Sequence, residues 1–136
     1  MYIQFRIEEF VPKKIFDQYG HKAWRFIDLE IVKSAQHIKN HFKAPTICND
    51  WLWGGKMQFR GYRPEWCDIG SKTSLHRLRG ALDLTIVGFE PEEVREAIRK
   101  NWDKWGIARI EADVNWNHID RLWYPNQREL VEFQAK

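Results

Sequence analysis

The sequence predicts a single α+β domain in which a small, mostly antiparallel sheet packs against helices. Three observations support this prediction. Two segments place apolar side chains at helical spacing, several short segments suit strands, and 136 residues allow one hydrophobic core but leave little room for two. Hydrophobic residues make up 43% of the chain, which suits such a core and excludes a disordered segment. Residues 1–136 are therefore treated as one domain.

The N-terminal third is expected to hold a short strand and one long helix. Residues 2–10 mix apolar and charged positions ahead of Pro12, which suits a short strand. Between residues 20 and 42, apolar side chains recur every three or four positions, as on one face of a helix. The side chains of this face are Trp24, Ile27, Ile31, Ala35, Ile38 and Phe42. Pro45 ends the helix, and residues 46–48 suit another short strand.

Residues 49–75 are predicted to form a long irregular segment, because glycines and prolines interrupt every periodic pattern there. An irregular segment of this length inside a compact domain is often functional. Its aromatic side chains indicate that it packs against the domain. These are Trp51, Trp53, Phe59, Tyr62 and Trp66.

The C-terminal half alternates between strands and helices. Residues 81–87 alternate as a strand does, with Asp83 on the more polar face. A helix is expected to open at Pro91, with acidic residues in its first turn, and to stop at Gly106. Residues 107–119 suit one or two short strands, and residues 127–136 a short final helix.

The composition excludes several classes of function. Lys and Arg total 22 against 19 Asp and Glu, and a net charge of +3 is too small to indicate a nucleic-acid partner. No apolar run approaches the ~20 residues that span a bilayer, and the first residues do not resemble a signal peptide. We therefore expect cytoplasmic synthesis without membrane insertion. Between residues 56 and 79 basic side chains are in excess, which suits either an anionic substrate or a solvated loop. Cys48 and Cys67 are expected to be free thiols.

The segment from Ser74 to Asp83 carries the clearest chemical signal. His76 precedes a turn at Gly80, and Asp83 follows on the polar face of the expected strand. Glycine permits backbone geometry that other residues avoid, so this turn can bring the imidazole beside the carboxylate. His118 lies in a second strand-like segment. Two histidines and one carboxylate form a three-ligand set for zinc, which leaves a fourth tetrahedral position for water and thus suits catalysis.

A wider pattern surrounds these ligands: Gly61-Tyr62-Arg63, Gly70, Ser74, His76, Gly80-Ala81, Asp83 and His118-Ile119-Asp120. In this pattern the chain resembles the D-alanyl-D-alanine carboxypeptidase and L-alanyl-D-glutamate endolysin family of zinc peptidases. Relatives in that family include vancomycin-resistance D,D-dipeptidases and the hedgehog signalling domain. The shared motif is SxHxxGxAxD with a later HxD, and this chain has one extra residue between His76 and Gly80. The resemblance is greatest to compact phage and prophage members, and it implies a hedgehog/D,D-peptidase-like fold.

The resemblance also implies roles for individual residues. Zn²⁺ would be held by His76, Asp83 and His118. Arg63 would bind a substrate carboxylate or the developing oxyanion, because a guanidinium suits pairs of oxygens. Ser74 would contact substrate or orient His76, or would serve only as a turn residue. Trp116 falls near the expected site, where it would either line a groove for glycan or peptide or pack in the core.

The general base is less clearly marked. The family commonly places an acidic residue three positions before the last histidine, but Asn115 occupies that position here. Asp113 and Glu111 are the nearest acids on that side of His118. On one regular strand both would point away from His118, so a bulge or turn near Asn115 is needed to bring either one round. Distance along the chain favours Asp113, followed by Glu111.

Three functional hypotheses result. The leading one is a zinc-dependent peptidase that hydrolyses peptidoglycan stem-peptide amide bonds next to D-residues, as a phage or prophage endolysin does, and that reaches the cell wall after release. The second is a non-catalytic peptidoglycan-binding or virion-structural module that retains the fold. The third is a metal-dependent enzyme on the same scaffold with a substrate outside the wall.

Overall fold

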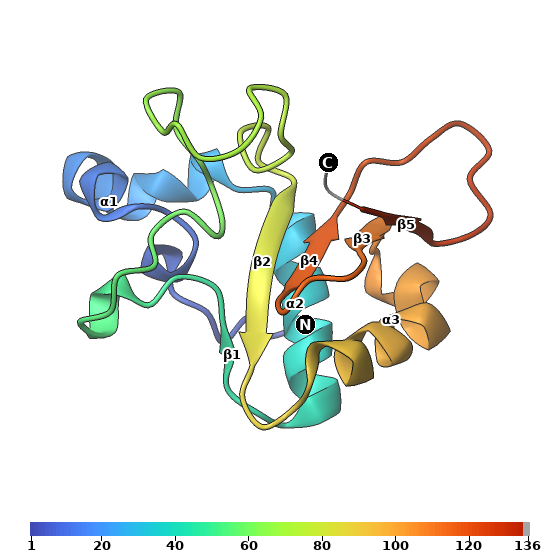
Figure 1. Ribbon diagram of the computed structural model, residues 1–136. Coiled ribbons are helices and arrows are strands. Elements are labelled where there is room, and N and C mark those ends of the chain that lie inside the picture. The colour runs from blue at the N-terminus through green and yellow to red at the C-terminus, as the bar shows by residue number, and fades with distance from the viewer. Residues whose placement is uncertain (135–136) are drawn as a thin grey trace.

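A five-stranded mixed sheet forms the centre of the protein (Figure 1), whose computed structural model describes residues 1–134. The strands lie in the order β1-β2-β4-β3-β5. Their bounds are Thr46–Ile47 (β1), Ala81–Ile86 (β2), Arg109–Glu111 (β3), Asn117–Asp120 (β4) and Val131–Phe133 (β5). Neighbouring strands are antiparallel except β3 and β5, which are parallel. The predicted α+β class and the mostly antiparallel sheet are confirmed.

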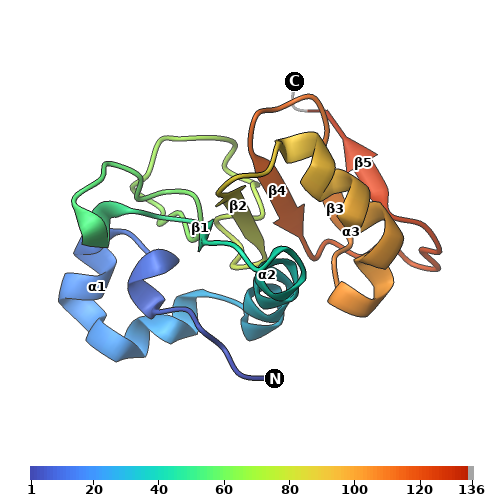
Figure 2. The ribbon, with the colours of Figure 1, turned by 90° about the horizontal axis from the view of Figure 1, so that it is seen from below.

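Three α-helices and three short 3₁₀ helices surround the sheet in the described part of the chain. The α-helices span Lys13–Tyr19 (α1), Leu29–Phe42 (α2) and Pro91–Trp105 (α3), and the 3₁₀ helices Ile7–Glu9 (η1), Gly20–Phe26 (η2) and Trp51–Trp53 (η3). In both ribbon views α1 lies toward the β1 side of the sheet and α3 toward the β5 side (Figures 1 and 2). Within residues 1–134, no helix combines the length and the apolar character needed to cross a membrane.

The caps of α3 explain why this helix was predictable. Glu90 and Glu93 form a capping box at its start, where Pro91 occupies the first helical position. Gly106 ends it in the left-handed conformation, with a φ of 70°. Both expected boundaries are confirmed.

Three expectations for local structure are wrong. Residues 2–10 contain the 3₁₀ helix η1 and no strand, since the Glu9 side chain accepts a hydrogen bond from the backbone of Arg6 and closes a turn. The long helix begins at Leu29 instead of residue 20, because Asp28 caps a new helix after η2. The tail forms strand β5 instead of a helix, because Val131–Phe133 pairs with β3. Residues 135–136 of the expected tail helix lie outside the described residues.

One face of the sheet packs in the hydrophobic core, and the other carries the candidate site residues. On one face, Leu82, Leu84 and Ile119 are fully buried in a core shared with α2 and α3. Alternate residues of a strand point to opposite faces, so the neighbours of these side chains project from the other face. That second face carries Asp83 and His118.

Candidate metal centre

Sheet register assembles most of the site as one row of side chains. Asp83 on β2 lies directly opposite His118 on β4. The register of β3 on β4 brings Glu111 level with His118, and the register of β5 on β3 places Phe133 beside Glu111. Residues opposite one another on neighbouring strands project from the same face. Four strands thus contribute one side chain each to the row.

His76 reaches this row from the turn that precedes β2. The backbone N–H of Gly80 donates to the carbonyl of Leu75 at 3.1 Å and closes the turn. The left-handed position within it is Arg79, with a φ of 75°, whereas Gly80 has no positive φ. The expectation that Gly80 supplies the unusual backbone geometry is therefore wrong. The turn nevertheless accommodates the extra residue between His76 and Gly80.

The three expected ligands meet in a buried cluster. Nε2 of His76 lies 3.3 Å from Oδ1 of Asp83, and Nδ1 of His118 lies 3.0 Å from the same oxygen. One atom from each side chain can be chosen so that all three lie within 4.8 Å of one another. Tetrahedral ligands about 2.0–2.1 Å from zinc stand about 3.3 Å apart. The cluster of His76, Asp83 and His118 can therefore hold a metal ion.

The second nitrogen of each imidazole is already bound. Nδ1 of His76 lies 2.9 Å from the carbonyl of Gly61, and Nε2 of His118 lies 2.8 Å from Oδ2 of Asp120. A carbonyl and a carboxylate accept hydrogen bonds, so each of these ring nitrogens carries the proton. The remaining nitrogens both face Asp83. Two imidazole nitrogens thus point toward one carboxylate oxygen, and the outer partners fix both rings. Such an arrangement of donor atoms suits the binding of a cation between them.

The charges of the cluster reflect its hydrogen bonds. Burial by itself lowers the pKa of His118, but Asp120 and Asp83 outweigh this effect and raise that pKa to about 9. Burial raises the pKa of Asp83, yet its bonds to His118 and His76 hold that pKa well below the usual range. In the metal-free protein, Nδ1 of His118 therefore carries a proton that a metal must displace.

A pocket of about 700 Å³ opens onto the cluster. Glu111 is buried and lines this pocket together with His76, Asp83 and His118. Asp113, by contrast, does not line this pocket. It is exposed on the turn between β3 and β4, where its φ is 60° and its carboxylate accepts a hydrogen bond from Gln134.

On one regular strand, Glu111 and His118 would face opposite ways. The chain instead turns near Asn115, and this turn separates Glu111 on β3 from His118 on β4. Across two strands the cross-strand register decides which side chains share a face, and the parity of the chain offset does not.

Arg63 lies between the cluster and the preceding loop. Its Nε donates to the carbonyl of Phe59 at 2.8 Å, and its Nη2 lies 3.4 Å from Oδ2 of Asp83. A Cβ atom on Gly70 would lie 2.7 Å from Nη1 of Arg63, so glycine at that position leaves room for the guanidinium. Arg63 lines the pocket at the cluster together with His76 and Asp83.

Ser74 and Trp116 also line this pocket. The hydroxyl of Ser74 accepts a hydrogen bond from the backbone N–H of His76 at 3.2 Å, so Ser74 orients the histidine through the turn. The carbonyl of Trp116 accepts from Arg95 at 3.1 Å, which anchors this residue to α3. Among residues 1–134, the indole Nε1 of Trp116 is a buried donor without an acceptor.

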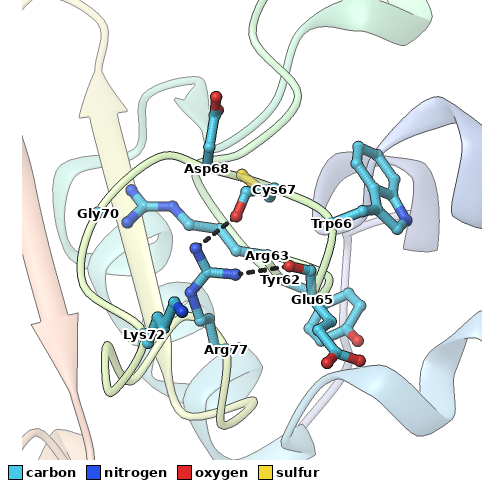
Figure 3. Close-up of a pocket in the computed structure, with 9 residues that line it drawn as sticks. All are labelled: Tyr62, Arg63, Glu65, Trp66, Cys67, Asp68, Gly70, Lys72 and Arg77. Atoms are coloured by element: carbon cyan, nitrogen blue, oxygen red, sulfur yellow. Dashed lines mark hydrogen bonds between the residues drawn. The ribbon is translucent and has the colours of Figure 1, made fainter.

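A second pocket of about 670 Å³ adjoins the first and shares Arg63 and Gly70 with it (Figure 3). Its wall is built around Arg77, whose guanidinium donates to the backbone carbonyls of Glu65 and Cys67 (Figure 3). The same guanidinium donates to the backbone carbonyl of Pro64 at 2.9 Å. Part of the basic excess between residues 56 and 79 is therefore used to fold the loop. Cys67 and Cys48 are free thiols, as expected.

Two residues near His118 were not predicted from the sequence to be parts of the site. Arg109 binds both carboxylate oxygens of Asp120, and Phe133 packs against the imidazole of His118. Arg109 and Glu111 stand on either side of the core residue Ile110. Because alternate residues of a strand face opposite ways, this pattern in the sequence indicates that both point away from the core, toward the site. Phe133 gave no such signal, because its segment was expected to be helical.

Comparisons of the chain with protein-family models, with curated proteins and with solved structures return no match. The geometry of the site and the sequence pattern around it therefore carry the functional argument.

Proposed function

We propose that the protein is a zinc-dependent peptidase that hydrolyses amide bonds next to D-residues in peptidoglycan stem peptides, as a phage or prophage endolysin does. The observation that carries this proposal is the buried cluster of His76, Asp83 and His118 at a pocket that also contains the carboxylate of Glu111. Two imidazoles and one carboxylate with an open fourth position are a typical ligand set of catalytic zinc. The sequence pattern of residues 61–120 supplies the substrate class and a hedgehog/D,D-peptidase-like centre.

Zn²⁺ held by these three side chains would polarise the scissile carbonyl and lower the pKa of a water molecule toward ~7. The protein positions the ligands for this task before any metal arrives. Gly61 and Asp120 hold the outer nitrogens of the two rings, so that His76 offers Nε2 and His118 offers Nδ1.

Glu111 is the general base in this proposal. Its carboxylate stands in the row beside His118 and lines the pocket, which Asp113 does not. Glu111 would take a proton from the attacking water as oxygen adds to the carbonyl carbon. The same proton would then pass to the amide nitrogen as the C–N bond breaks and the amine leaves.

Arg63 would stabilise negative charge on the substrate. Two of its nitrogens are fixed by Phe59 and Asp83, so the guanidinium is held at the pocket wall before substrate binds. A guanidinium held this way suits a carboxylate or an oxyanion. Trp116 and Ser74 would form further parts of the wall that contacts the peptide.

Metal content and wall digestion test the proposal. The purified protein should contain one zinc per chain, and incubation with muropeptides should release new amines, detected by mass spectrometry. His76→Ala should abolish both the zinc and the release. A wild-type protein without stoichiometric zinc, or a His76→Ala variant with full lytic activity, would refute the proposal.

A pair of variants distinguishes the two candidate bases. Glu111→Gln should lower kcat/KM by about 10³-fold, because a general base typically contributes 10²–10⁴-fold. Asp113→Asn should change it less than threefold, and both variants should retain zinc. The reverse result, with Asp113→Asn the damaging change, would reject Glu111 as the base.

A non-catalytic peptidoglycan-binding or virion-structural module is the second candidate. Asn115 favours it, because an amide stands where related enzymes commonly have an acid. Stoichiometric zinc together with wall binding, but with no amine released from any muropeptide, would support this candidate over the peptidase.

A further inference from the structure

The edge strand β5 packs against the ligand His118. The rings of Phe133 and His118 lie 5.3 Å apart between centroids and are nearly perpendicular, with an interplanar angle of 88°. Perpendicular ring pairs at this distance attract each other and restrict ring rotation. Phe133 therefore holds one side of an imidazole that the sheet register already places in the row of site residues.

Arg109, on the neighbouring strand β3, links β5 to the other side of His118. Its Nε and Nη2 lie 2.9 to 3.1 Å from the carboxylate oxygens of Asp120, which is fully buried. The guanidinium also lies over the ring of Phe133, with its carbon 4.4 Å from the ring centroid. Such stacking favours a flat, fixed guanidinium. Phe133 thus contacts both the ligand ring and the side chain that orients Asp120.

These contacts determine which nitrogen of His118 can bind metal. Oδ1 of Asp120 accepts hydrogen bonds from Arg109 and from the backbone N–H of Leu122. Its Oδ2 accepts from Arg109 as well and lies 2.8 Å from Nε2 of His118. With Nε2 bound there and the ring held by Phe133, only Nδ1 faces His76 and Asp83. A rotation of the ring would break both contacts at once.

We propose that Arg109 and Phe133 are positioning residues of the metal centre, so that the docking of strand β5 increases metal affinity even though β5 supplies no ligand. This inference rests on the proposed zinc role of His118. Neither residue contacts the ion. Arg109 acts through Asp120, and Phe133 acts on the imidazole directly and on Arg109 by stacking.

Zinc affinity of the full chain, measured by competition with a chromophoric chelator, tests the inference. Phe133→Leu removes the ring, and Arg109→Gln removes the guanidinium. Each should weaken zinc binding about tenfold or more, as loss of an outer partner typically does. Phe133→Tyr, which keeps the ring, should stay within about threefold of wild type, and Arg109→Lys, which keeps the charge, should recover part of the loss.

The matched control is Glu132→Gln. Glu132 also lies on β5, and its carboxylate pairs with Arg99 on α3 at 3.0 Å, but this pair lies away from His118. Glu132→Gln should therefore lower the unfolding temperature of the metal-free protein without changing zinc affinity more than about twofold.

The absorption spectrum of the cobalt-loaded protein gives a second readout that a purely structural role would not change. Phe133→Leu and Arg109→Gln should shift the visible bands, whereas Glu132→Gln should leave them in place. Unchanged affinity and spectra in the first two variants would overturn this inference alone. A wild-type protein that binds no zinc would overturn the proposed function as well. If Phe133→Leu unfolds, the Arg109 pair provides the same test without altering β5.

Discussion

The two histidines of the cluster are held in different ways. His76 comes from a turn, and its outer nitrogen donates to the carbonyl of Gly61, a neutral backbone group. His118 comes from the central strand β4, and its outer nitrogen binds the buried carboxylate of Asp120. A backbone carbonyl thus fixes the ring of His76, whereas charged side chains fix the ring of His118.

Each of the two arrangements has its own structural requirement. A Cβ atom on Gly61 would lie 2.4 Å from the carbonyl oxygen of Phe10, so the backbone beneath His76 approaches its neighbour at a distance that only glycine permits. Asp120 needs no such approach, but a buried carboxylate requires partners, and Arg109 and His118 supply them. The orientation of His76 depends on backbone packing, and that of His118 depends on charged partners.

Removal of each histidine should show the largest effects. His76→Ala and His118→Ala should each weaken zinc binding by more than the ~100-fold that loss of an outer partner can cause. In the metal-free protein the variants should differ. His118→Ala leaves two buried carboxylates without this partner and should lower the free energy of unfolding by about 3–5 kcal/mol. His76→Ala leaves the Gly61 carbonyl unpaired and should cost about 1–3 kcal/mol.

Urea unfolding of both variants in the presence of a chelator measures this difference. Equal losses of stability would show that the carboxylates around His118 do not depend on its charge.

The pH dependence should follow His118. Its pKa of about 9 in the folded protein exceeds the ordinary value of 6.5. Its stabilising contribution is therefore fully present below pH 6.5 and is lost as pH rises through 9, with a total on the order of 3 kcal/mol. In zinc-saturated protein the metal replaces the proton, so this loss should be absent. Zinc affinity itself should rise by up to about tenfold per pH unit over the same range.

Unfolding curves at several pH values, with chelator and with zinc, test this prediction. Metal-free stability that does not change between pH 6.5 and 9 would contradict a protonated His118.

The carboxylate behind His118 should matter less than the ligand itself. Asp120→Asn keeps the shape of the side chain but removes its charge, and should weaken zinc binding about 10- to 100-fold. The exposed carboxylate of Asp103 on α3 offers a matched control, and Asp103→Asn should leave zinc affinity unchanged. Chelator competition measures both. An Asp120→Asn variant with wild-type zinc affinity would mean that His118 does not need a charged partner, just as His76 does not.

The smallest effect concerns the turn that carries His76. Arg79 has a φ of 75°, which costs a residue with a side chain about 1–2 kcal/mol. Arg79→Gly removes this strain but makes the unfolded chain more flexible, at a cost of about 0.4–1 kcal/mol. The net expectation is a gain of about 0.5 kcal/mol in the free energy of unfolding, with no change in zinc affinity. A loss of stability in urea unfolding would show that the turn gains more from the Arg79 side chain than from relief of strain.

The sequence predicted those elements whose conformation depends on residues close to one another in the chain. The caps of α3 lie within a few residues of its ends, and the alternation of β2 placed Asp83 on the face opposite Leu82 and Leu84. The tail was predicted incorrectly. Val131–Phe133 is too short to reveal its conformation, and it becomes a strand because an open edge of β3 lies beside it.

The sequence by itself determined which three side chains can hold the metal, because their chemistry and order are visible in the chain. Only the tertiary structure decided what surrounds them: Glu111 instead of Asp113 at the pocket, and the contacts of Arg109 and Phe133 around His118. The physical reason is that periodicity fixes the direction of a side chain on its own strand only. Which side chains meet across strands depends on register and turn length, and long-range pairing sets both of these.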